Sequence, residues 1–73
     1  MSYEIRIVWD EDAAVWIASS PDLPGLILES CSFDALLERV RYAVPELIEL
    51  NGQQSEIYNL TYTTEHHDQV KTI

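Results

Sequence analysis

The sequence is poor in cysteine and in basic residues. Its one cysteine, Cys31, excludes an internal disulfide and a cysteine-ligated metal cluster of the usual spacing. The four lysines and arginines are scattered at Arg6, Arg39, Arg41 and Lys71. A nucleic-acid-binding domain clusters such side chains to attract phosphates, so we expect no direct nucleic-acid binding by this chain alone.

Long apolar runs and a targeting segment are also lacking. The apolar stretches are a few residues long, far short of the roughly 20 that a membrane helix needs. The first residues, Met1 to Glu4, show no basic segment followed by an apolar run, which is the pattern of a signal peptide. We therefore expect a cytoplasmic protein in a reducing environment, without membrane contact.

What the sequence has in excess is acid. Asp and Glu number 13 against 4 Lys and Arg, which gives a net charge of −9. Such a surplus favours solubility and attracts basic partners. Hydrophobic residues make up 47% of the 73 residues, enough for the core of one domain spanning residues 1–73. Because so short a chain has a small core, self-association or a partner would stabilise it.

Apolar patterning predicts four strands and one helix. Period-two alternation predicts strands at Tyr3–Trp9, Ala13–Ser19, Leu26–Ser30 and Ile57–Thr64. After the third strand, an apolar stripe at spacings of three and four predicts one amphipathic helix. Ser32 is its expected N-cap and Asn51-Gly52 its stop, and we expect it to continue, bent, through Pro45. The order β-β-β-α-β predicts an α+β fold: a small, mainly antiparallel sheet with one helix packed on one face.

One helix covers only one face of such a sheet. The alternation assigns Val8, Val15, Ile17 and Ile27 to the other face. An exposed apolar patch of this kind usually marks an interface. We therefore expect a homodimer or higher oligomer, or a complex with a partner.

Three acids gather in the expected turn between the first two strands. Asp10, Glu11 and Asp12 form either a solvated turn or a patch that contacts a partner. Trp9 and Trp16 lie on the strands that flank the turn, and we interpret them as cross-strand or core-packing residues. The alternative for Trp16 is that it takes part in the same contact surface.

The loop before the third strand contains two prolines and a glycine. Pro21 to Gly25 is either a rigid connection or a preformed contact element, because a stiff loop loses little entropy on binding. In the second reading Leu23 is exposed between the two prolines. The loop's candidate contact residues are Asp22, Leu23, Pro24 and Gly25.

The carboxylates do not follow the pattern of a nuclease. A two-metal site needs acids that converge from several elements, and neither Ile5–Val8 nor Ile57–Thr64 contains one. His66 and His67 are adjacent and would point to opposite sides of a strand, so we interpret both as incidental surface residues. We expect no enzymatic activity, no metal and no other cofactor.

Several segments together resemble a known family, the HicB-like antitoxins. The resemblance covers about residues 3–50 and is closest to a small branch described only as a domain of unknown function. It rests on Val8-Trp9-Asp10-Glu11, Ala14-Val15-Trp16-Ile17-Ala18, Ser20-Pro21-Asp22-Leu23-Pro24-Gly25-Leu26, the helix entered at Ser32, and Ala43-Val44-Pro45-Glu46-Leu47.

The resemblance implies a partial RNase H-like fold without nuclease activity. It also implies an antitoxin of a type II toxin-antitoxin system, which binds and occludes HicA, a small basic toxin that cleaves mRNA. Many relatives carry a further C-terminal DNA-binding domain. We expect none in this chain, because only one predicted strand and a short tail follow Ile57. The alternative is a stand-alone HicB-like adaptor or structural module that self-associates and has no toxin partner.

Overall fold

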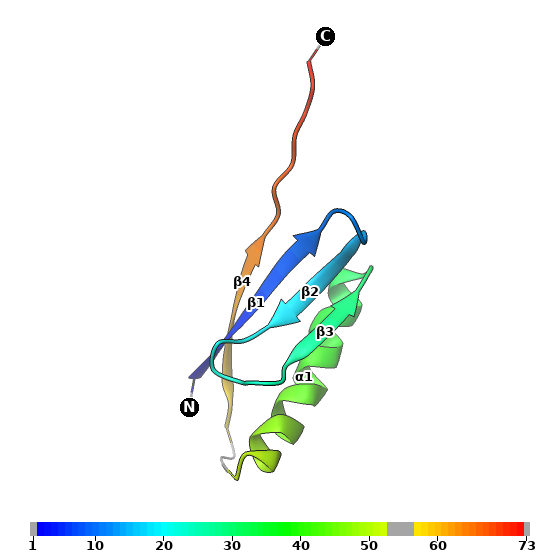
Figure 1. The fold of residues 1–73 in the computed structure, drawn as a ribbon. Coiled ribbons are helices and arrows are strands. Elements are labelled where there is room, and N and C mark those ends of the chain that lie inside the picture. Colours follow the sequence, from blue (N-terminus) through cyan, green and yellow to red (C-terminus); the bar gives the residue numbers. More distant parts are fainter. Residues whose placement is uncertain (1, 53–56, 73) are drawn as a thin grey trace.

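The computed structural model describes residues 2–52 and 57–72 of the chain. In chain order it contains β1 (Ser2–Asp10), β2 (Val15–Ser19), β3 (Ile27–Ser30), α1 (Phe33–Leu50) and β4 (Asn59–Glu65). The predicted order β-β-β-α-β is therefore confirmed (Figure 1). The strand limits differ from the predicted ones by one or two residues. At β2 the difference arises because Ala13 and Ala14 belong to the turn after β1.

The four strands form one mixed sheet in the order β3-β2-β1-β4. The pairs β1–β2 and β2–β3 are antiparallel, whereas β1 and β4 are parallel. The parallel pair arises because β4 enters the sheet only after the long crossover through α1, on the far side of β1. The expected, mainly antiparallel sheet is thus confirmed.

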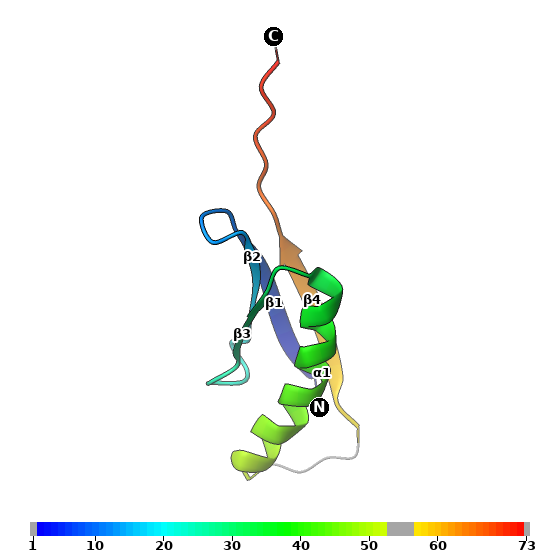
Figure 2. The same cartoon turned by 90° about the vertical axis from the view of Figure 1, so that its right-hand side faces the viewer.

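The core lies between one face of the sheet and α1 (Figure 2). Alternate residues of β1 supply the sheet side, with Ile5 and Ile7 fully buried. The helix side is a stripe at intervals of four residues, all within 1% of complete burial. Its members are Leu36, Val40, Val44 and Ile48.

Both ends of α1 are capped as the sequence predicts. The Ser32 hydroxyl accepts a hydrogen bond from the Ala35 backbone N–H at 3.2 Å. At the other end, the N–H groups of Asn51 and Gly52 donate to carbonyls of the last turn at 3.1 and 3.0 Å. Gly52 adopts φ 77°, which glycine reaches without steric cost. The helix runs without interruption through Pro45.

The C-terminal segment leaves the sheet at the end of β4 and extends away from it (Figures 1 and 2). It gives the molecule its elongated extents of 55 × 19 × 18 Å. None of the helical residues that the structure describes forms a segment apolar and long enough to cross a membrane.

Candidate interaction surface

The acidic hairpin tip is built around Asp10. Its Oδ1 accepts hydrogen bonds from the backbone N–H groups of Asp12 at 3.1 Å and Ala13 at 3.3 Å. This side chain closes the turn, and Ala14 completes it with φ 55°. Glu11 and Asp12 are exposed and are free to present their charges outward. Of the three predicted contact residues, Asp10 therefore has a structural role in the turn.

The prediction that Leu23 is exposed in the Pro21–Gly25 loop is wrong. Its side chain is 3% exposed and belongs to the core, together with Leu26. The Leu26 N–H donates to the Leu23 carbonyl at 3.1 Å, which folds the loop back over the end of the core. Burying the Leu23 side chain removes apolar surface from water, which stabilises the fold more than exposing it between two prolines would.

Asp22 ties the same loop to β1. The ladder between β1 and β2 ends at Arg6 and Ser19, and the next outward-pointing N–H of β1 belongs to Glu4. Continued pairing would place Pro21 opposite Glu4. Instead, Oδ2 of Asp22 accepts that N–H at 2.7 Å. The side chain of the predicted contact residue Asp22 thus takes the place of a backbone carbonyl at this point of the ladder. The other two candidates in the loop, Pro24 and Gly25, are exposed.

The hairpin tip and the loop lie at opposite ends of β2 (Figure 1). The surface between them is the sheet face that α1 does not cover, which we call the open face. Its residues alternate with the buried ones, as predicted for Val8, Val15, Ile17 and Ile27. Val8 is 43% and Ile27 74% exposed.

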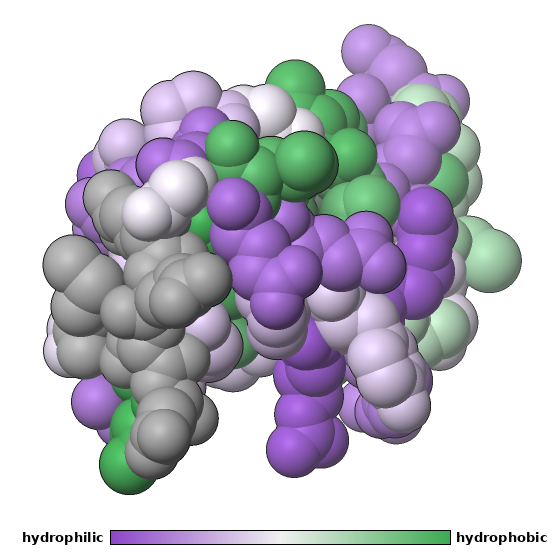
Figure 3. All heavy atoms as spheres, turned by 90° about the horizontal axis from the view of Figure 1, so that it is seen from below, coloured by the Kyte–Doolittle hydropathy of each residue, from purple (hydrophilic) through white to green (hydrophobic). Residues whose placement is uncertain are grey.

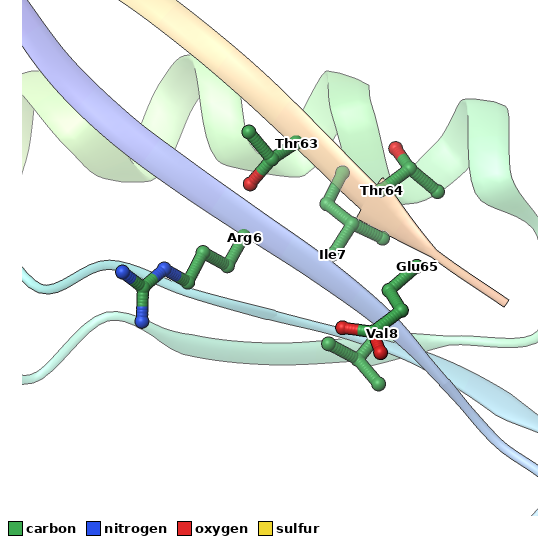
Figure 4. Close-up of a pocket in the computed structure, with 6 residues that line it drawn as sticks. All are labelled: Arg6, Ile7, Val8, Thr63, Thr64 and Glu65. Atoms are coloured by element: carbon green, nitrogen blue, oxygen red, sulfur yellow. The ribbon is translucent and has the colours of Figure 1, made fainter.

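In the strand register, one row of neighbouring side chains crosses the open face through all four strands. Glu29 of β3 lies opposite Ile17 of β2, Ile17 opposite Val8 of β1, and Val8 opposite Glu65 of β4. The row therefore has an apolar centre between two carboxylates. Figure 4 shows the Val8 and Glu65 side chains next to each other.

A hollow of about 330 Å³ follows the same two strands. It is lined by Arg6, Ile7, Val8, Thr63, Thr64 and Glu65 (Figure 4). Beside it, Glu4 accepts a 2.9 Å hydrogen bond from the Arg6 guanidinium, and this contact raises the pKa of Arg6. Among the residues that the structure describes, Arg6 is the only cation on the open face, and its charge is paired with that of Glu4.

An aromatic cluster occupies the sheet face towards α1. Trp9 and Trp16 lie opposite each other in the register, with ring centroids 5.1 Å apart in an edge-to-face arrangement. Phe33, the first residue of α1, packs against Trp16 at 5.0 Å. The interpretation of the tryptophans as cross-strand or core-packing residues is confirmed: they pair across the two strands, and half-buried Trp16 also packs against the core.

His66 completes this cluster. Its ring centroid lies 5.6 Å from that of Trp9 and 5.4 Å from that of Trp16. His67 contacts the carboxylate of Glu65. Among the residues described, no three His, Cys, Asp or Glu side chains converge as ligands of a metal ion.

The end of the molecule where α1 stops has a different surface. Figure 3 views this end and shows an apolar area bordered by polar side chains. The candidate interaction surface is the open face together with the exposed acids of the hairpin tip.

Comparison with known families decides the classification. The sequence model of the family Domain of unknown function (DUF1902) matches residues 2–71. The chain belongs to this family. A solved structure is similar over nearly the whole length of this DUF1902 chain, covering 99% of it and 100% of the other chain, with 32% identity and a TM-score of 0.73. That structure is the crystal structure of hypothetical protein TTHA1013 from the extremely thermophilic bacterium Thermus thermophilus. No curated protein matches the sequence.

Sequence reasoning missed the position of His66 in this DUF1902 domain. The residue looks incidental in the sequence because it follows a polar strand. Extending the β1–β4 register by one residue beyond Val8 and Glu65 places His66 beside Trp9. That register depends on the parallel pairing of β1 with β4, in which each residue lies opposite one 57 positions later, and no local pattern encodes it.

Proposed function

We propose that this DUF1902 chain is a HicB-like antitoxin that binds and occludes a small, basic, HicA-like ribonuclease. It acts by binding, and the chain itself catalyses no reaction. The observation that carries the proposal is the row Glu29, Ile17, Val8 and Glu65 across the open face.

The row has the composition of a binding surface. Interfaces combine an apolar centre, which supplies affinity, with a polar rim that excludes water and selects the partner. Here the rim is acidic, and the chain as a whole carries −9. A ribonuclease binds RNA phosphates with basic side chains, so the two surfaces are complementary in sign. Such complementarity speeds association and favours the correct partner.

The hairpin tip extends the acidic rim. Glu11 and Asp12 are exposed at the end of β1 and β2, the two strands that carry Val8 and Ile17. We assign them to the contact surface together with the row. Three further residues hold this surface in place. The Asp10 side chain closes the turn, the Asp22 side chain accepts the Glu4 N–H, and the Leu23 side chain packs in the core.

The test starts from a small basic protein encoded beside this gene. Co-expression with the chain is expected to relieve the growth arrest that the basic protein causes, and the two proteins are expected to co-purify. Changing Glu11→Lys and Glu29→Lys together should abolish both effects.

The matched control places the same charge change elsewhere. Glu38 and Glu46 are exposed on α1, on the other side of the sheet, so Glu38→Lys with Glu46→Lys should leave rescue and co-purification intact. Equal loss in both double variants would show that only net charge matters and would remove the open face from the proposal. The absence of any such neighbour, with a stable homodimer of the chain alone, would favour the self-associating adaptor.

A further inference from the structure

The outer edge of β4 carries backbone groups that the sheet does not use. Backbone N–H and C=O groups alternate between the two sides of a strand. The N–H of Glu4 points towards β2, so the N–H groups of the odd-numbered residues of β1 point towards β4. In the parallel register, the backbone groups of Thr61 and Thr63 therefore form hydrogen bonds with β1. The N–H and C=O groups of Leu60, Tyr62 and Thr64 point outward, away from the sheet. All residues of β4 except Leu60 are exposed.

The opposite edge of the sheet is protected. β3 has four residues, and its outward-facing Glu29 carbonyl accepts a hydrogen bond from the Arg39 guanidinium at 2.8 Å. Short length and a blocking charged side chain are the usual devices against strand addition. β4 has neither device: it has seven residues, six of them without charge, in the sequence Asn59-Leu60-Thr61-Tyr62-Thr63-Thr64-Glu65. Threonine and tyrosine favour strands.

A segment suited to this edge follows directly in the chain. Residues 67–72 continue beyond the sheet as an extended arm (Figure 1), and every one of them is exposed. The contacts of the arm are local: His67 with Glu65, and the Gln69 N–H with the Asp68 carboxylate at 2.8 Å. Within the described part of the chain, the arm therefore makes no contact that explains its extended course past the end of β1.

We propose that two copies of this chain pair through β4 and the arm, antiparallel, about a two-fold axis at His66. Each arm then lies along the outer edge of the other copy's β4. The two four-stranded sheets join into one continuous sheet, with both helices on the same side.

Side-chain chemistry favours this register over the one with its axis at Glu65. A two-fold axis at Glu65 would set two carboxylates directly opposite each other, which is unfavourable. The axis at His66 places Glu65 opposite the partner's His67, and Tyr62 opposite the partner's Val70. Val70 is 81% and Tyr62 37% exposed in the single chain, so this contact covers two exposed apolar surfaces. It also uses the outward N–H and C=O groups of Tyr62 and Thr64.

The pairing leaves the open face uncovered, because it uses an edge of the sheet. Self-association and the proposed binding of a basic ribonuclease are therefore independent, and a dimer would present two open faces. The charge of −9 on each copy opposes association. The paired backbone and the contacts at Glu65 and Tyr62 must supply the favourable free energy.

The first test compares two substitutions at Thr64. Thr64→Pro removes an outward N–H that the chain's own sheet does not use, and proline is tolerated at such an edge position. Thr64→Ala keeps the N–H and serves as the matched control. Sedimentation equilibrium should give twice 8.4 kDa for the parent chain and Thr64→Ala, and 8.4 kDa for Thr64→Pro with an unchanged circular dichroism spectrum. If Thr64→Pro unfolds, a chain ending at His67 replaces it and should also be monomeric.

The second test reads the register. In a Cys31→Ser background, His66→Cys should form an intermolecular disulfide on mild oxidation, because the axis brings that position close to its own copy. Glu65→Cys should not. A parent chain that is monomeric at every concentration would overturn the proposal, as would a dimer that persists in both Thr64→Pro and the truncated chain. Cross-linking through Glu65→Cys alone would overturn the register.

Discussion

At the scale of single residues, Leu23 shows why a polar loop can be part of the core. Five of the six residues from Ser20 to Gly25 are polar or conformationally special, and the loop looks like a surface feature. Its one large apolar side chain nevertheless turns inward and closes the end of the core. The loop is thus fixed by the burial of Leu23, by the hydrogen bond from the Leu26 N–H to the Leu23 carbonyl, and by the Asp22 carboxylate on the Glu4 N–H.

We predict that Leu23→Ala lowers the free energy of unfolding by about 2–4 kcal/mol, because it leaves a cavity among buried side chains. Urea denaturation followed by circular dichroism measures the change. Ile27→Ala, four residues along and 74% exposed, is the control and should cost no more than about 0.5 kcal/mol. Similar losses in the two variants would contradict the burial of Leu23.

Tyr62 gives the chain a dependence on alkaline pH. Partial burial raises the pKa of its hydroxyl above the ordinary value of 10.0, and nearby Arg41 offsets part of this effect. The unfolded chain therefore releases this proton at a lower pH than the folded chain. The contribution of the Tyr62 hydroxyl to the free energy of unfolding is complete below about pH 10, and it is lost as the pH rises through the folded-state pKa.

We predict that Tyr62→Phe loses less stability than the parent chain between about pH 9 and about pH 11, because the variant has no proton to release there. Urea unfolding at a series of pH values measures the two slopes. Parallel slopes would show that Tyr62 does not contribute to the alkaline loss.

At the scale of elements, α1 follows almost entirely from its own sequence. Each of its features is local in the sequence. The helix starts after a serine that caps its first turn, it stops at an Asn-Gly pair, and its buried stripe consists of apolar residues four positions apart. Pro45 does not end the helix, because the stripe keeps Val44 and Ile48 in the core on either side of it. Packing against the sheet outweighs the hydrogen bond that proline removes.

We predict that Ser32→Ala lowers the free energy of unfolding by about 1 kcal/mol, because the Ala35 N–H loses its acceptor. Thermal unfolding measures the effect. Ser32→Asp restores an acceptor and a favourable charge at the helix N-terminus, so its loss should be smaller. Equal losses for alanine and aspartate would show that the hydroxyl does not cap the helix.

The sheet is less predictable than the helix. Alternation in β1 and β2 predicts the right faces, including Val8 and Ile17 on the open side. The place of β4 beside β1 and the contact of His66 with the two tryptophans depend on pairing between distant segments. The roles of Asp10 and Asp22 are hidden for another reason: a carboxylate that accepts backbone N–H groups looks like any other acid in the sequence.

At the scale of the whole molecule, part of the negative charge is concentrated around the open face. Several acids have local structural partners, but Glu11, Asp12 and Glu29 are exposed around an uncovered apolar surface. The only cation on the open face, among the residues described, is paired with Glu4. The net charge of −9 and the apolar centre together describe a surface suited to a basic partner.

The association rate with the small basic neighbour protein tests the central claim most directly. Stopped-flow measurements on the parent chain should show a rate that falls steeply as ionic strength rises. With Glu11→Lys and Glu29→Lys, the rate at low salt should drop at least about tenfold and its salt dependence should flatten. The Glu38→Lys and Glu46→Lys control should stay close to the parent chain. A parent rate that is independent of salt, or unchanged by the open-face substitutions, would contradict the account.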